Sequence, residues 1–437
     1  MPISDEFAHR LLSILPAVVD AYGTPFHIYD ARGIVETHCA MIRAFKGEPF
    51  RQYFAIKALP NPIILELLLR EGSGLDCSSP AELTLARRVG AITDDVVFTS
   101  NNTSSSEYAL GLRAGALMTF DDRSLFDKVD ALPQVICFRI SPHGLIANST
   151  LVGDAVRSKF GVPMEELAGA YRQARRRGAT RFGIHGMMCA NELDVHRAVQ
   201  AAVEVIETGA RTCAAADIEL EYINVGGGLG IPYRPEDRPL NFSVYADAIL
   251  QTRRRCFPAG RRPRILMECG RYVTGPHGVL VTRVINRCRK GRDIVGLDAS
   301  MSALMRPGFY GAYHHLSLPF ATGRPETRFD VVGSLCENMD KFAIDRLLPD
   351  PREGDIAVIH DTGAHGHAMG FTYNGRLRPA ELLLKPDGDV VEIRRAEAFD
   401  DYIATAQWQP RSVYKAASVP EPGKDFTTRP QLPGEVA

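Results

Sequence analysis

The sequence predicts an α/β plus β protein with two parts. Residues 31–271 are expected to form a (β/α)8 barrel of the TIM type, and residues 1–30 together with 272–437 an antiparallel β-sandwich or β-barrel domain. Before residue 272, short β-rich runs alternate about eight times with amphipathic helical patterns, which is typical of a closed parallel barrel. After residue 272, alternating apolar runs are separated by Gly, Pro and Asp turns, which is typical of antiparallel strands.

The predicted elements follow in chain order. The expected barrel strands lie at 53–57, 75–76, 96–100, 116–120, 135–140, 181–187, 220–228 and 264–271, with helices between them, such as those over 62–72 and 78–90. In the β domain, strands are expected within 279–289, 355–363 and 390–395, and the strand at 25–30 is a candidate to join them. The tail from Val419 is rich in Pro, Gly and charge and is expected to be loosely ordered.

Composition narrows the class of protein. The chain has 437 residues, 45% of them hydrophobic, and a net charge of −1, so nothing in the charge balance indicates a nucleic-acid or anionic-membrane partner. We see neither a long apolar run nor a signal-peptide pattern at the N-terminus. The nine cysteines contain no CxxC pair, which argues against a disulfide framework. We therefore expect a cytoplasmic protein with reduced thiols.

Active sites in barrels of this type lie at the carboxyl ends of the strands. The polar side chains and glycines at the ends of the predicted strands are Lys57, Asp76, Arg139, His185, Gly226, Gly227, Gly228, Glu268 and Arg271. We expect them to meet at the barrel mouth.

These residue types suit one kind of chemistry. A desolvated Lys57 would hold a neutral amine that can form an imine, although a lysine at a strand end can also simply extend to solvent. The glycines at 226–228 could cradle a phosphate or form a tight turn, and Arg271 could bind the same phosphate. Glu268 could keep a pyridine nitrogen protonated, or form a local salt bridge with Arg271.

The second half of the chain adds candidate substrate groups. Arg306 could bind a substrate carboxylate, Glu337 could pair with a substrate ammonium, and Cys336 could donate a proton or be a buried thiol. His360, His365 and His367 form a cluster, but no acidic or Cys partner stands at usual metal spacing, so we predict no metal site.

Taken together, these segments resemble the fold-type III pyridoxal-5'-phosphate (PLP) decarboxylases, most closely the diaminopimelate decarboxylase branch. The resemblance extends from about Thr24 to Leu384. The motifs that carry it are Tyr53-Phe-Ala-Ile-Lys57-Ala, Gly74-Leu-Asp76-Cys-Ser-Ser-Pro-Ala-Glu82, Asn224-Val-Gly-Gly-Gly-Leu-Gly230, Glu268-Cys-Gly-Arg271, Arg306-Pro-Gly-Phe-Tyr310, Cys336-Glu337 and Tyr373-Asn374.

The resemblance implies a PLP-binding barrel with a C-terminal β domain, as in alanine racemase and ornithine decarboxylase, and a role for each matching residue. Lys57 would bind PLP covalently, His185 would stack on its ring, Glu268 would pair with the ring nitrogen, and Cys336 would be the acid. The phosphate would be held by Arg271 and the glycines at 226–228, with further cofactor contacts from Asp76, Gly270, His365 and Tyr373. The substrate would be bound by Arg271, Arg306, Tyr310 and Glu337. The Cys336-Glu337 loop would reach the neighbouring subunit's site, which implies a homodimer with shared sites.

Two departures from the family pattern concern the site. The usual Ser after the histidine motif is missing from 186–191, where Asn191 or a backbone amide is a candidate replacement. The usual Gly-Ala-Tyr is replaced by Gly363-Ala-His365, so His365 or Tyr373 is expected to take the role of that tyrosine.

We therefore expect decarboxylation of a diamino acid, with meso-2,6-diaminopimelate converted to L-lysine and CO2 as the favoured reaction. D-lysine, D-ornithine or another basic or pathway-specific amino acid is the alternative. A racemase of the same fold would have an Arg at the pyridine nitrogen, so Glu268 argues against one. A non-catalytic PLP-binding homologue would lack groups such as Cys336 and Arg306, which this chain retains.

Overall fold

The computed structural model describes residues 3–141 and 158–414. The predicted loose tail from Val419 lies outside these residues. One compact unit extends to Glu397, and the residues from Ala398 form a second unit, in which the short helix α12 (Phe399–Tyr402) is described.

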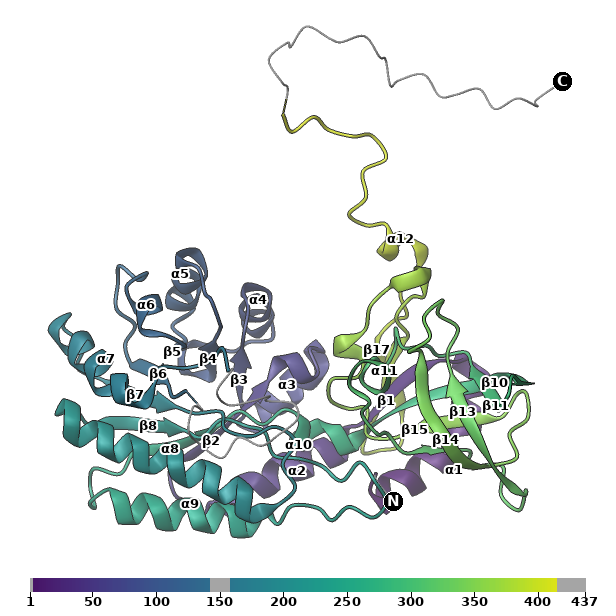
Figure 1. Ribbon diagram of the computed structural model, residues 1–437, viewed down its shortest axis with the longest axis horizontal. Helices are drawn as coiled ribbons and strands as arrows, with labels where there is room; N and C mark the ends of the chain where they lie inside the picture. Colours follow the sequence, from purple (N-terminus) through teal and green to yellow (C-terminus); the bar gives the residue numbers. More distant parts are fainter. Residues whose placement is uncertain (1–2, 142–157, 415–437) are drawn as a thin grey trace, which may run out of the picture. The chain divides into compact units, whose positions relative to one another are not determined.

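Eight parallel strands close the predicted barrel, each hydrogen-bonded to the next and the last to the first (Figure 1). They are β2 (Phe50–Ala55), β3 (Gly74–Cys77), β4 (Val96–Thr99), β5 (Leu117–Phe120), β6 (Ile136–Arg139), β7 (Phe182–His185), β8 (Leu220–Asn224) and β9 (Arg264–Met267). The expected parallel barrel is confirmed.

A helix follows every barrel strand, and α2 (Ala31–Ala44) precedes the first. They are α3 (Pro62–Arg70), α4 (Pro80–Arg88), α5 (Ser105–Ala114), α6 (Arg123–Phe126), α7 (Met164–Arg176), α8 (Val195–Ala216), α9 (Phe242–Cys256) and α10 (Arg271–Thr274). Their starts are encoded locally. Ser104 and Glu107 form a capping box at α5, and Asn61 caps α3 directly before Pro62.

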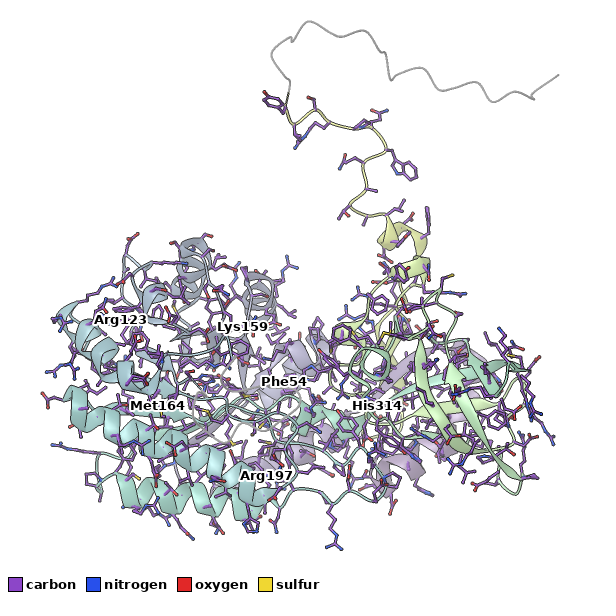
Figure 2. The ribbon with its side chains drawn as sticks, in the orientation of Figure 1. Phe54, Arg123, Lys159, Met164, Arg197 and His314 are labelled. Carbon is purple, nitrogen blue, oxygen red and sulfur yellow. The ribbon has the colours of Figure 1, made fainter. Side chains whose placement is uncertain are left out.

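The space between strands and helices is filled by one large apolar core. Phe54 of β2, labelled in Figure 2, is fully buried in it, with Phe98, Phe120 and Phe138 from the following strands. Burying a Phe side chain stabilises a fold by about 1.5–3 kcal/mol. This core holds the strand ends in fixed positions around the barrel mouth.

The second part of the main unit is a nine-stranded sheet in the order β14-β13-β11-β10-β1-β16-β17, with β15 paired to β10 and β12. Its strands are β1 (Phe26–Asp30), β10 (Gly278–Arg289), β11 (Asp293–Leu297), β12 (Leu316–Ser317), β13 (Glu326–Val332), β14 (Lys341–Pro349), β15 (Ile356–Ile359), β16 (Ala380–Leu384) and β17 (Val390–Arg394). The helix α1 (Asp5–Tyr22) packs its apolar face on β1, β10 and β16.

The strand at 25–30 does join this sheet, but the sheet is mixed rather than antiparallel. β1 pairs in parallel with β16, and β11 pairs in parallel with β13. β1 enters from before the barrel and lies between strands that follow it, so short turns do not dictate its direction. The sequence also did not lead us to predict the helices α1 and α2 or the strands β11, β12, β13, β14 and β16 as separate elements.

A buried carboxylate joins the barrel to the sheet. Glu381 of β16, 1% exposed, accepts hydrogen bonds from Tyr29 Oη at 2.7 Å, from Asn61 Nδ2 at 3.0 Å and from Arg394. Removing one partner would leave a buried charge poorly compensated, so this network fixes the sheet against the first βα turn of the barrel. Among the described residues, no helix is both long and apolar enough to cross a membrane.

Candidate active site

A cavity of about 290 Å³ lies at the carboxyl ends of the barrel strands. Its lining includes Ala55, Lys57, Asp76, Ser78, Thr99, Asn101, Arg139, Phe160, His185, Met187, Asn191, Gly228, Glu268, Gly270, Arg271 and His365. Most of the strand-end residues that the sequence singled out therefore line one cavity, whereas Gly226 and Gly227 do not belong to its lining.

Lys57 lies slightly differently from the prediction. β2 ends at Ala55, and Lys57 follows in a 3-10 turn over Ile56–Ala58. The turn extends the side chain into the cavity. We expected a desolvated lysine there, but the side chain is exposed. The amine is therefore accessible to a small molecule in the cavity.

Glu268 is held by two side chains. Its Oε2 lies 3.1 Å from His185 Nε2, and its Oε1 accepts a hydrogen bond from Asn224 Nδ2 at 2.6 Å. Burial acts to raise the pKa of Glu268, but His185, Lys57 and Asn224 outweigh it, and the pKa lies below its ordinary value. Glu268 is an ionised acceptor, and it forms no salt bridge with Arg271.

Asp76 behaves in the opposite way. Burial and the nearby Glu268 carboxylate raise the pKa of Asp76 well above its ordinary value, against the opposing influence of Lys57. Its Oδ1 is buried without a hydrogen-bond partner among the described residues. The surroundings thus shift the pKa values of the two carboxyl groups in opposite directions, as is common in active sites.

The glycine run has a packing reason. A Cβ at Gly228, where φ is +86°, would lie 2.0 Å from the carbonyl oxygen of Cys189, and one at Gly227 would lie 2.5 Å from that of Glu268. The loop after β8 therefore needs glycine to lie against the loops after β7 and β9. The N–H of Gly228 has no partner within 3–141 and 158–414, so it remains available to a phosphate in the cavity.

Two arginines meet at Tyr233, a buried residue that the sequence gave no reason to select. Arg271 donates a hydrogen bond to the Tyr233 hydroxyl, and the guanidinium of Arg306 lies 4.7 Å from the centre of the Tyr233 ring. Arg306 is 4% exposed and donates to His314 Nε2 at 2.8 Å, while His314 Nδ1 donates to the His360 carbonyl at the same distance. Burial and Arg306 lower the pKa of His314 to about 3, so it is a neutral acceptor.

His365 stands where the family has tyrosine. Its φ is +57°, its N–H donates to the Ala58 carbonyl at 2.8 Å, and its ring lines the cavity. Burial and the cations Arg271, Arg306 and Lys57 lower the pKa of His365 well below its ordinary value. Its imidazole is therefore neutral.

A second group of predicted residues lies apart from the cavity lining. Cys336 and Glu337 are exposed, and the Cys336 N–H donates to Asn374 Oδ1 at 2.7 Å beside Tyr373. Tyr310, at the end of the short helix α11 (Arg306–Tyr310), is 48% exposed, whereas Arg306 at its start is buried. Within one chain these side chains do not line the cavity.

The structure also shows the segment 186–191, in which the serine usual in the family is missing. Asn191, the candidate replacement for the missing serine, lines the cavity, and its Oδ1 is buried with no partner among the described residues. Met188 is buried in the barrel core and does not line the cavity. Asn224, Tyr233 and His314 were missed by sequence reasoning; only Asn224, at a strand end, carried a signal that could have found it.

The cavity suits an aldehyde cofactor with a pyridine ring and a phosphate. The cavity is lined by the accessible amine of Lys57, the ionised carboxylate of Glu268, and the cation of Arg271 with the free N–H of Gly228. Its volume is close to the lower limit for small-molecule sites. The barrel and this site define a class of enzyme that acts on amines through such a cofactor.

Comparisons with known proteins agree with this class of enzyme. Residues 31–275 match the family described as pyridoxal-dependent decarboxylase, pyridoxal binding domain. Protein TabA of Pseudomonas amygdali pv. tabaci is 67% identical over 95% of this chain and 98% of its own, and the diaminopimelate decarboxylase of Methanothermobacter thermautotrophicus is 35% identical over 91% and 96%. The structure of Helicobacter pylori diaminopimelate decarboxylase complexed with L-lysine covers 89% of this chain and 98% of its own, with 28% identity and a TM-score of 0.81.

The chain belongs to the pyridoxal-dependent decarboxylase family. It is a PLP-dependent decarboxylase, and the resemblance inferred from the motifs is confirmed.

Proposed function

We propose that this enzyme decarboxylates a diamino acid that has a second carboxylate, and that meso-2,6-diaminopimelate is the substrate, giving L-lysine and CO2. The observation that supports this is the pair of guanidinium groups at Tyr233. Among the described residues, neither Arg271 nor Arg306 has a carboxylate partner. Arg306 is buried and Arg271 is half-buried, and charges in such places are normally compensated, so two anionic groups suit this part of the site. The cofactor phosphate supplies one and a distal substrate carboxylate the other.

Asp361 does not supply the anionic group that Arg306 lacks, although the charge of Arg306 acts on the pKa of this carboxyl group. Its carboxyl oxygens are both buried without a partner among the described residues. Burial raises the pKa of Asp361 to about 8, against the opposing influence of Arg306. At neutral pH the group is mostly uncharged, which leaves Arg306 for a ligand.

We assign the cofactor contacts as follows. Lys57 binds PLP covalently through its amine, and Glu268 meets the pyridine nitrogen. Arg271 and Gly270, which follow β9, would hold the phosphate together with Gly226, Gly227 and Gly228, which follow β8, and Asp76 and His365 would add further cofactor contacts. The positions of Lys57, Glu268, Gly228, Arg271 and His365 around one cavity support this assignment.

When bound, PLP supplies an electron sink for the carbanion left by the departing CO2. The ionised Glu268 would hold a proton on the pyridine nitrogen. Arg306 binds the distal carboxylate and so orients the α-carboxylate for loss. Cys336, with Lys57 as the alternative donor, returns a proton to the α-carbon.

We further propose a homodimer with shared sites. Cys336, Glu337 and Tyr373 are exposed and lie outside the cavity lining of their own chain. A second copy of the chain would bring Cys336 to the α-carbon and Glu337 to the distal ammonium of the substrate.

A related pathway-specific diamino acid is the second candidate. His365 in place of tyrosine changes the cavity wall beside Arg271 and Arg306, and a relative with 67% identity is named Protein TabA rather than diaminopimelate decarboxylase. D-lysine and D-ornithine are less favoured, because neither has a second, distal carboxylate for Arg306 to bind.

The test is CO2 release by the purified enzyme with meso-diaminopimelate, both enantiomers of lysine, ornithine and arginine. Turnover of meso-diaminopimelate is expected to dominate, and Arg306→Gln should lower kcat/KM for it by about 10- to 100-fold, the value of a lost charged hydrogen bond. Arg287→Gln is the matched control, since Arg287 is paired with Asp350 in the sheet. Faster turnover of D-lysine, or an equal loss from both variants, would contradict the proposal.

A further inference from the structure

Asn224, the last residue of β8, bridges two loops at the barrel mouth with its side-chain amide. It is fully buried and is absent from the cavity lining. Its Nδ2 donates to Glu268 Oε1 at 2.6 Å, and its Oδ1 accepts the N–H of Gly226 at 2.9 Å. One side chain therefore joins the carboxylate that follows β9 to the first glycine that follows β8.

A backbone hydrogen bond closes this bridge. The Glu268 N–H donates to the Gly226 carbonyl oxygen at 2.8 Å, so both the N–H and the carbonyl of Gly226 are held. The φ of Gly226 is +70°, and a Cβ there would lie 2.5 Å from the carbonyl oxygen of Gly186, so only glycine can follow this path. The course of the chain towards Gly228, whose N–H has no partner among the described residues, is therefore set by Asn224 and Glu268.

The same amide determines which form of Glu268 fits. A backbone N–H can only donate, so the oxygen of the Asn224 amide faces Gly226 and its NH2 group faces Glu268. Glu268 Oε1 must then accept, as an ionised carboxylate does. Burial acts to raise the pKa of Glu268, and the hydrogen bond from Asn224 is one of the contacts that bring this pKa below its ordinary value. Asn224 therefore favours the charged form of the carboxylate.

We propose that Asn224 is a positioning residue for both ends of the cofactor. It holds Glu268 as a hydrogen-bond acceptor for the pyridine nitrogen, and it holds Gly226 so that the glycines after it meet the phosphate. Asn224 acts through these two residues, because it does not itself line the cavity. The inference rests on the proposed placement of PLP, with Glu268 at the ring nitrogen, and is independent of which amino acid the enzyme uses.

The ring end is tested by nitrogen NMR of the holoenzyme, loaded with PLP that is isotopically labelled at the pyridine nitrogen. The wild-type signal should stand at the position of a protonated ring. In Asn224→Ala, Glu268 loses a donor that stabilises its charged form, so it should take the proton more readily and the signal should move towards that of a neutral ring.

Glu268→Gln is the reference for complete loss of the carboxylate in this experiment. A wild-type signal in Glu268→Gln would show that the proposed placement of PLP is wrong. A signal that moves in Glu268→Gln but not in Asn224→Ala would show that the placement is right and the role of Asn224 is wrong.

The phosphate end is tested by the dissociation constants of PLP and of pyridoxal, which lacks the phosphate. Their ratio measures what the phosphate contributes to binding. Asn224→Ala should lower this ratio by about 10-fold, because Gly226 and the glycines after it lose their anchor. Glu268→Gln should weaken the binding of both ligands and leave the ratio near wild type. A wild-type ratio in Asn224→Ala would overturn the claim for the phosphate end.

Asn241→Ala is the matched control. Asn241 lies in the same connection between β8 and α9, is exposed, and caps the helix by accepting the N–H of Val244. Its loss should lower the unfolding midpoint and leave both cofactor readouts at wild type. Asn224→Ser keeps a hydroxyl in place of the amide and serves if Asn224→Ala does not fold; it should show both effects at a smaller size. Wild-type values of both readouts in a folded Asn224 variant would overturn the proposal.

Discussion

Asp361 is a buried carboxyl group four residues before His365, and its pKa makes stability depend on pH. Burial raises the pKa of Asp361 to about 8, whereas an unfolded Asp titrates near 3.9. Between these values the folded chain binds one more proton than the unfolded chain, so the contribution of Asp361 to stability is full at low pH and falls as pH rises.

Asp361→Asn should remove this dependence. The stability of the variant relative to wild type should rise by about 1.4 kcal/mol per pH unit between pH 5 and 7, and more slowly towards pH 8. Asn tolerates the φ of +59° at this position, so the backbone is not a new source of strain. The measurement is chemical denaturation of both proteins at each pH; a constant difference would show that Asp361 is already ionised at pH 6.

Single residues also show where sequence reasoning works. Lys57, Asp76, His185 and Glu268 were selected because polar side chains stand out at the ends of apolar strands, and the structure places all four in one cavity. Tyr233 and His314 carried no such signal. Tyr233 is far from Arg306 in the sequence, and His314, although only eight residues after Arg306, follows no strand end that would have singled it out.

At the scale of elements, the loops after β7 and β8 pack so closely that glycine is required. The nearest atoms to a new Cβ at Gly228 belong to the backbone of Cys189, which cannot move aside as a flexible side chain would. Gly228→Ala should lower stability by about 2 kcal/mol or more and weaken PLP binding.

Gly169 in α7 is the matched control, because a Cβ there would meet nothing within 4 Å. Gly169→Ala should raise stability by about 0.5–1 kcal/mol through its helix propensity and leave PLP binding unchanged. Denaturant unfolding and PLP titration report both quantities. If the two alanine variants behaved alike, the packing argument would be wrong.

The barrel was predictable from the sequence because its strands are short apolar runs separated by helices with local caps. The mixed sheet was less predictable from the sequence. β1 pairs with β10 and β16, which follow it by some 250 and 350 residues, and its parallel pairing with β16 has no local signal. Pairings between distant segments depend on the whole fold, so the sequence predicted β1 and β10 as strands but neither their pairing nor β16.

At the scale of the whole molecule, the separation of Cys336 from the cavity of its own chain predicts that two chains share each site. Mixing inactive Lys57→Ala and Cys336→Ala chains should restore about a quarter of wild-type activity, since half of randomly formed dimers are heterodimers and each has one intact site. CO2 release after subunit exchange is the measurement. Heterodimers that form but stay inactive would show that each site is built within one chain.

The central claim is that Lys57 carries the cofactor at the barrel mouth. It is tested most directly by reducing the holoenzyme with borohydride, which fixes PLP to its lysine, and locating the label by peptide mass spectrometry. The label is expected on Lys57, and Lys57→Ala should lose both the label and the visible absorbance of the bound cofactor. A label on another lysine, or a visible absorbance that persists in Lys57→Ala, would contradict the claim.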